Sequence, residues 1–142
     1  MFHRVILILL LGAALIACAG IPGGQVRGHL MELVPADHDR PVILTVGETV
    51  SVRLDANRTT GYTWLLADTT IAKGALIPVH PESRYEKDIN GIYSMGAGAM
   101  EIWEFQAVEA GEGAIRLEYR RPFEPNVPPL RTLVFPVTVY RP

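Results

Sequence analysis

Three short segments of the chain carry small, hydroxyl-bearing or proline-stiffened residues of the kind found at loop tips. The segment 57–62 reads Asn-Arg-Thr-Thr-Gly-Tyr and offers two adjacent hydroxyls beside residues that tolerate a positive φ. The segment 94–100, Ser-Met-Gly-Ala-Gly-Ala-Met, has side chains small enough for its backbone to approach another surface closely. The segment 120–125, Arg-Arg-Pro-Phe-Glu-Pro, combines cations and an aromatic ring on a backbone restricted by proline. These residue types favour contact with a partner surface.

Residues that could catalyse a reaction form no recognisable constellation. The sequence contains no HExxH, GxSxG or phosphate-loop motif. Glu101 and Glu104 are close in sequence, but the alternation of a strand places them on opposite faces, where they cannot form an acid–base pair. The four histidines share no motif and are scattered along the chain, at His3, His29, His38 and His80. The sequence therefore predicts that the protein is not an enzyme.

Metal, cofactor and nucleic-acid binding are also disfavoured. A single cysteine excludes a cysteine-based zinc site and an internal disulfide. His29 and His38, with Asp37 or Asp39, would make only an adventitious metal site, so we expect no metal and no cofactor. The net charge of −2 lacks the basic footprint of a nucleic-acid-binding domain. What remains is a protein partner, and we expect the chain to be a monomer.

The first eighteen residues have the layout of an export signal that ends at the only cysteine. Two basic residues precede an apolar stretch, 5–14, that is shorter than the roughly 20 residues of a membrane span. Leu15, Ile16, Ala17 and Cys18 follow, and this run resembles a bacterial lipobox. The resemblance implies that residues 1–17 are a lipoprotein signal peptide and that Cys18 carries the lipid.

The lipobox also implies a location. Residues 18–28 are rich in Gly and predict a flexible tether after the lipidated cysteine. Ala19 follows the cysteine where an inner-membrane retention signal would have Asp. We therefore expect the protein to be exported and anchored to the bacterial cell envelope, on the outer rather than the inner membrane of a Gram-negative cell. Residues 29–142 would form one domain.

The domain reads as short strands separated by turn residues. Residues 50, 52 and 54 are apolar and alternate with polar ones, and the last segment, 133–139, has the same period of two. Pro78 suggests that the weak strand around it lies at a sheet edge. Seven to eight such strands predict an all-β fold, an antiparallel immunoglobulin-like β-sandwich. Its core would be rich in aromatic residues, namely Trp64, Trp103, Phe105, Tyr119 and Phe135.

Taken in order, the three loop segments resemble the motifs of the chagasin-like inhibitors of papain-family cysteine peptidases. That family carries NPTTGY or NPTTGF, then GxGG, then RPW, on three loops at one end of an immunoglobulin-like fold. The matching residues of this chain are Asn57, Thr59, Thr60, Gly61 and Tyr62 in the first loop, Gly96, Ala97 and Gly98 in the second, and Arg121, Pro122 and Phe123 in the third. The likeness extends over roughly residues 41–140.

The resemblance implies a reversible, competitive inhibitor that occludes the catalytic cleft of a papain-family cysteine peptidase, from the same organism or from a host. The loop with Thr59 and Thr60 would enter the cleft beside the catalytic Cys–His pair. The second loop would lie along one wall, and Arg121 and Phe123 would hold the other. Loops held by strands lose little entropy on binding.

Three residues depart from the family pattern. Arg58 replaces a proline and removes a φ restraint. Ala99 replaces a glycine, which would cause strain if that position needs a positive φ. Phe123 replaces a tryptophan and reduces the stacking area. Because the same sandwich can present other recognition loops, a non-inhibitory binding or structural module of the cell envelope is the alternative interpretation.

Overall fold

The computed structural model describes residues 30–67, 74–87 and 99–142, which form nine strands and two short 3₁₀ turns. Residues 1–29, with the predicted signal peptide, Cys18 and the tether, lie outside this part of the chain, and so do Gly96, Ala97 and Gly98. The elements are β1 (Leu30–Leu33), η1 (Pro35–Asp37), β2 (Val42–Thr45), β3 (Thr49–Ala56), η2 (Arg58–Thr60), β4 (Thr63–Leu66), β5 (Leu76–Pro78), β6 (Arg84–Lys87), β7 (Ala99–Ala107), β8 (Gly111–Arg120) and β9 (Arg131–Tyr140).

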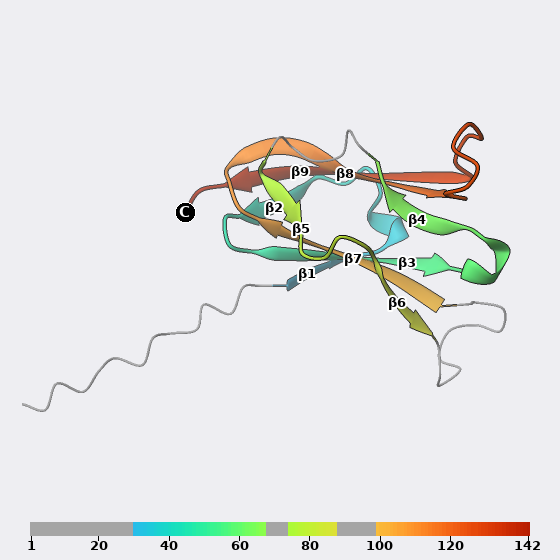
Figure 1. Cartoon of the computed structure of the whole chain (residues 1–142). Coiled ribbons are helices and arrows are strands. Elements are labelled where there is room, and N and C mark those ends of the chain that lie inside the picture. The colour runs from blue at the N-terminus through green and yellow to red at the C-terminus, as the bar shows by residue number, and fades with distance from the viewer. Residues whose placement is uncertain (1–29, 68–73, 88–98) are drawn as a thin grey trace, which may run out of the picture.

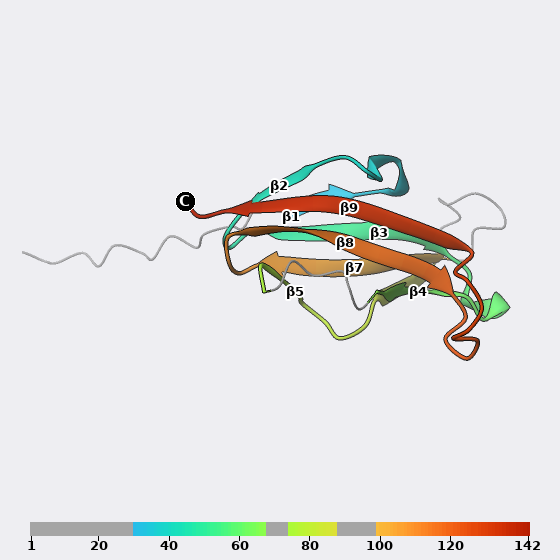
Figure 2. The ribbon, with the colours of Figure 1, turned by 90° about the horizontal axis from the view of Figure 1, so that it is seen from above.

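The strands form two sheets that pack face to face (Figure 1). One sheet has the order β1-β3-β7-β5, and β6 also pairs with β7. The other has the order β2-β9-β8-β4. Seen from above, β8 and β9 lie over β3 and β7 (Figure 2). The predicted all-β sandwich is confirmed, and β5 lies at a sheet edge as Pro78 suggested.

The strands pair mostly antiparallel, as predicted, but two strand pairs are parallel. β1 runs parallel to β3, and β2 runs parallel to β9, while the other strand pairs are antiparallel. Parallel neighbours require a crossover instead of a hairpin. Here the chain leaves β1, passes through η1 to β2 in the other sheet, and returns to β3 beside β1. Alternating polarity indicates which face of a strand is buried and not which way its neighbour runs, so the residue pattern does not reveal this arrangement.

The core lies between the sheets and follows the predicted alternation. Val50, Val52 and Leu54 of β3 are fully buried, as is Phe135 of β9. Four of the five predicted core aromatics are buried, whereas Tyr119 is only half-buried at the margin of the core. No helix in the described part of the chain is long and apolar enough to cross a membrane.

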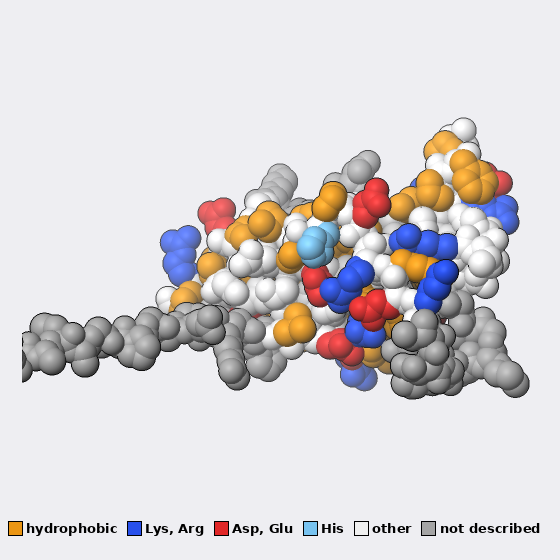
Figure 3. Space-filling view, turned by 60° about the horizontal axis from the view of Figure 1, so that its bottom comes forward, with side chains coloured by type: hydrophobic (Ala, Val, Ile, Leu, Met, Phe, Trp, Pro, Cys, Tyr) orange, Lys and Arg blue, Asp and Glu red, His pale blue; other side chains and the backbone are white. Residues whose placement is uncertain are grey.

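The outer face of the β1-β3-β7 sheet carries charges of both signs (Figure 3). Arg53 lies 3.5 Å from Glu86, and Arg84 pairs with both Glu86 and Glu104. Because opposite charges are interspersed there, this face offers no single-sign surface to a partner. Charged side chains along a sheet also discourage edge-to-edge association.

Candidate functional site

The loop between β3 and β4 is held in shape mainly by its first residue, Asn57. Its side-chain Oδ1 accepts hydrogen bonds from the backbone N–H of Thr59 (3.1 Å) and from the hydroxyl of Thr59. Its backbone carbonyl accepts from the Thr60 hydroxyl at 2.7 Å. Asn57 is thus the N-cap of the turn η2, a role that suits a short polar side chain. Both threonines remain exposed at the tip of the sandwich.

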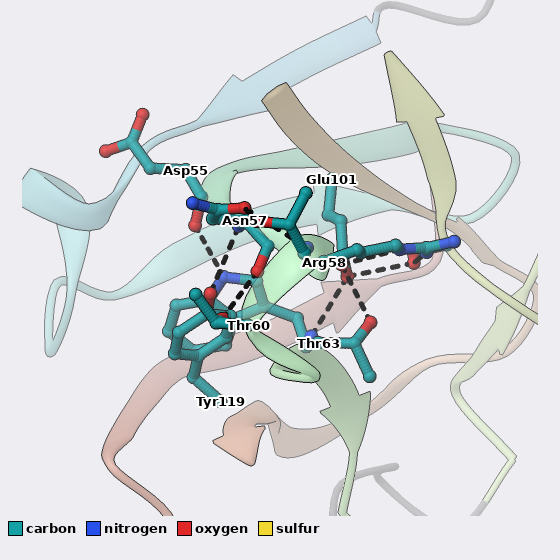
Figure 4. Close-up of polar contacts among 10 residues, drawn as sticks. Asp55, Asn57, Arg58, Thr60, Thr63, Glu101 and Tyr119 are labelled. Carbon is teal, nitrogen blue, oxygen red and sulfur yellow. Dashed lines mark hydrogen bonds and ion pairs between the residues drawn. The ribbon is translucent and has the colours of Figure 1, made fainter. Parts of the chain in front are cut away.

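The loop is also tied to the opposite sheet. The backbone N–H of Asn57 donates to the hydroxyl of Tyr119 in β8 at 3.1 Å (Figure 4). The ring of Tyr119 packs against those of both Tyr62 and Trp64, with centroid distances of 5.3 and 5.1 Å. The residue pattern predicts only a core role for Tyr119, yet its hydroxyl positions the loop. No motif would have revealed this, since Asn57 and Tyr119 are 62 residues apart.

The loop between β8 and β9 lies against the loop between β3 and β4. Arg121 donates from Nε to the carbonyl oxygen of Thr60 at 3.2 Å, and its guanidinium lies 4.6 Å from the centre of the Tyr62 ring. The Phe123 ring lies next to Gly61, yet 69% of the Phe123 residue stays exposed. Two of the three predicted loops therefore meet and present two threonines and an aromatic ring together.

Arg120 holds the backbone of the loop between β8 and β9. Its guanidinium donates to the carbonyl oxygens of Pro125 and Val127 and pairs with Glu118 of the same strand at 3.3 Å. The sequence predicts an exposed loop position for Arg120, but the structure makes it the last residue of β8 and a brace for the backbone. The exposed Phe123 is thus carried by a loop with fixed ends.

The predicted loop 94–100 lies largely outside the described residues. Gly96, Ala97 and Gly98 belong to the part that the structure does not describe, whereas Ala99 begins β7 and pairs with Ala56 of β3. Because Ala56 directly precedes Asn57, β7 begins at the end of the sandwich that carries the first loop. Ala99 is not among the residues with positive φ, so the strain that its replacement of glycine would have caused is not present.

A groove of about 710 Å³ opens beside the two loops. Gly61, Tyr62, Pro122 and Phe123 line it, together with apolar residues of β4 and Trp103. The Nε1 of Trp103 is buried without a hydrogen-bond partner. In the segments the structure describes, no group of three or more His, Cys, Asp or Glu side chains could hold a metal ion. The exposed groups gathered at this end of the sandwich are hydroxyls and an aromatic ring.

Arg58, which stands at the start of η2 where the family pattern has a proline, points away from the tip. Its Nε lies 3.0 Å from Oε1 of Glu101, which is fully buried at the start of β7 (Figure 4). Glu101 and Glu104 do lie on opposite faces of the strand, as expected, since Glu104 instead pairs with Arg84 on the outer face. No sequence motif indicates that the buried carboxylate serves the loop, because its partners come from distant segments.

The part of the chain that contains the site is similar to known proteins. Residues 43–139 match the model of the chagasin family of peptidase inhibitors, I42. Amoebiasin-1 of Entamoeba histolytica is 28% identical over 96 residues, which cover 68% of this chain and 87% of that protein. The solution structure of Amebosin aligns with a TM-score of 0.62 at 29% identity and covers 80% of this chain and all of that one. The cysteine protease inhibitor EhICP2 of Entamoeba histolytica aligns with a TM-score of 0.67 at 18% identity, covering 78% and 96%. The chain belongs to the chagasin family of peptidase inhibitors, whose members are inhibitors and not enzymes.

Proposed function

We propose that the protein is a reversible, competitive inhibitor of papain-family cysteine peptidases and occludes their catalytic cleft with its loops. The main support is the contact between the loops 57–62 and 120–125, which presents Thr59, Thr60 and Phe123 on one preformed edge. Gly96, Ala97 and Gly98 would complete the edge as a third loop. The structural relative EhICP2 is described as a cysteine protease inhibitor, which is consistent with this activity.

The backbone of the first loop explains why a peptidase would be blocked by it rather than cleave it. Residues Arg58–Thr60 form a 3₁₀ turn in which Thr60 N–H donates to Asn57 O and Gly61 N–H donates to Arg58 O. A scissile peptide must lie extended with its carbonyl carbon open to the nucleophile. The turn holds Arg58–Thr60 out of the extended conformation, so the loop would fill the cleft without presenting a peptide bond to the thiolate.

Inhibition of papain by the purified full-length chain tests the proposal. A competitive inhibitor raises the apparent KM of a peptide substrate and leaves kcat unchanged. Thr60→Ala removes the hydroxyl that donates to Asn57 at the tip, so we expect about tenfold weaker inhibition. Thr138→Ala on β9 is the matched control and should inhibit like the parent. No inhibition of any papain-family enzyme in a panel at micromolar concentration would contradict the proposal.

We also propose that Cys18 anchors the protein to the bacterial cell envelope through a lipid, on the grounds of the lipobox-like run that ends there. The anchor would hold the inhibitor where exported or incoming peptidases act. Metabolic labelling with a fatty acid in a bacterial host should mark the parent chain and not the Cys18→Ser variant. Labelling that persists in the variant would rule out this attachment site.

A further inference from the structure

Glu101 is a buried carboxylate with an unusually complete set of donors. Its Oε1 accepts from the Thr63 hydroxyl at 2.7 Å and from Arg58 Nε at 3.0 Å. Its Oε2 accepts from the backbone N–H of Trp64 at 2.9 Å and from the Ser83 hydroxyl at 3.1 Å. The side chain itself has no exposed surface. One carboxylate of β7 thus receives donors from η2, from β4 and from the segment before β6 (Figure 4).

This arrangement constrains the positions of the donors. A buried charge is tolerated only when it is paired and its lone pairs are satisfied. Because each oxygen of Glu101 receives two donors, moving Arg58 or Thr63 away would leave part of a buried carboxylate without a partner. Charge-assisted hydrogen bonds of this kind are shorter and stronger than neutral ones. Both ends of the first loop are consequently held by one group.

Arg58 lies at the position where it can transmit this constraint to the tip. It is the first residue of the turn η2, directly before the exposed Thr59 and Thr60. Its guanidinium also donates to the Ser83 hydroxyl at 3.0 Å and lies 4.6 Å from the centre of the Tyr85 ring. Three contacts therefore hold the side chain against β6 and β7 while 42% of it stays exposed, and the charge that it adds to the loop is balanced at Glu101.

We propose that Glu101 and Arg58 are positioning residues that fix the inhibitory loop in this chain, in place of the backbone restraint of a proline. The inference rests on the proposed inhibitory function for the meaning of the loop. It predicts that Arg58 acts through Glu101 and not by touching the peptidase. A positioning residue and a residue that touches the peptidase make opposite predictions for substitution at position 58, because only a positioning residue can be replaced by another restraint on the backbone.

Proline is a compatible replacement at position 58. The first position of a helical turn needs no backbone N–H donor, and the preceding residue, Asn57, is already extended (φ −133°, ψ 90°) and so lies outside the α region that a following proline disfavours. Arg58→Pro should therefore inhibit papain within about threefold of the parent. Arg58→Ala, which removes the ion pair and adds no restraint, should inhibit about tenfold more weakly. If Arg58→Pro is as weak as Arg58→Ala, Arg58 is a contact residue and the proposal is wrong.

Glu101→Gln supplies the second arm. The substitution keeps the shape of the side chain but removes its charge, so we expect it to weaken inhibition about as much as Arg58→Ala, and the double variant to lose little more. Arg116→Ala is the matched control, because that arginine has a similarly exposed side chain (45% against 42% for Arg58) and pairs with Glu118 of its own strand. Additive losses, or a Glu101→Gln variant with parental inhibition, would overturn the proposal.

Amide hydrogen exchange of the free protein separates this inference from the proposed function. The backbone N–H groups of Thr59, Thr60 and Gly61 donate within the loop, so their exchange rates report its order without any peptidase. Glu101→Gln and Arg58→Ala should accelerate exchange at these three amides by about tenfold or more, whereas Arg116→Ala and Arg58→Pro should not. Unchanged exchange in Glu101→Gln would refute the positioning role even if the parent inhibits, and faster exchange would support it even if no peptidase is inhibited.

Discussion

At the scale of single residues, Gly61 lies where the loops 57–62 and 120–125 meet. Two features of the structure favour a residue without a side chain at this position. Its φ is +80°, in the left-handed region that other residues avoid. A Cβ at this position would lie 3.1 and 3.3 Å from two atoms of the Phe123 ring. The exposed ring therefore rests on a backbone position that only glycine leaves open.

Gly61→Ala should consequently reduce both stability and inhibition. The backbone conformation costs a residue with a Cβ about 1–2 kcal/mol, and the new methyl group pushes the Phe123 ring away by a few tenths of an ångström. We expect a lower Tm and at least tenfold weaker inhibition of papain. Gly47→Ala is a matched control, because Gly47 has a φ of +99° but a Cβ added there would meet no atom within 4 Å. It should lower Tm similarly and leave inhibition unchanged; equal inhibition by both variants would contradict the role given to the contact with Phe123.

The sequence predicted some residues of the site and missed others. The identities of Thr59, Thr60, Arg121 and Phe123 indicated a contact surface, and the structure brings these residues together. Glu101 could be assigned to the inner face by alternation, yet its function depends on donors 18 to 43 residues away. Such partners become visible only when the register of the sheets is known.

At the scale of elements, the loops 57–62 and 120–125 act together because Arg121 joins them. Its planar guanidinium both donates to Thr60 O and stacks on Tyr62, a combination that a lysine cannot reproduce. Arg121→Lys should keep the net charge and the fold but weaken inhibition about five- to tenfold, by roughly 1–1.4 kcal/mol. The measurement is the inhibition constant for papain, with Tm as the control for folding. Parental inhibition by Arg121→Lys would mean that its charge alone matters.

The elements themselves were predicted unevenly, for physical reasons. Strands with one buried face, such as β3 and β9, are indicated by their alternation. β6 escaped prediction because its sequence, Arg-Tyr-Glu-Lys, is polar and it is an edge strand that pairs only with β7. The parallel direction of β1 beside β3 and of β2 beside β9 escaped prediction because strand direction leaves no mark on the residue pattern.

At the scale of the whole molecule, the sandwich separates stability from recognition. The aromatic core between the sheets is buried, while the site lies at the end of the sandwich opposite the C-terminus (Figure 1). Phe135 is fully buried in that core, and Phe123 is 69% exposed at the site. Two residues of the same type therefore carry different tasks, and a pair of identical substitutions can distinguish the tasks.

Phe135→Ala should cost about 3–5 kcal/mol of unfolding free energy, because it removes buried surface and leaves a cavity in a packed core. Phe123→Ala removes mainly exposed surface, so the free energy of unfolding should change by less than about 0.5 kcal/mol, while inhibition of papain falls by tenfold or more. Denaturant unfolding of both variants, beside inhibition assays at a temperature where each is folded, measures the two effects. A large loss of stability in Phe123→Ala would show that the loop belongs to the folding core. Parental inhibition by that variant would show that the exposed ring does not touch the peptidase. We expect a stable Phe123→Ala variant with weak inhibition, because the exposed ring lies outside the packed core between the sheets.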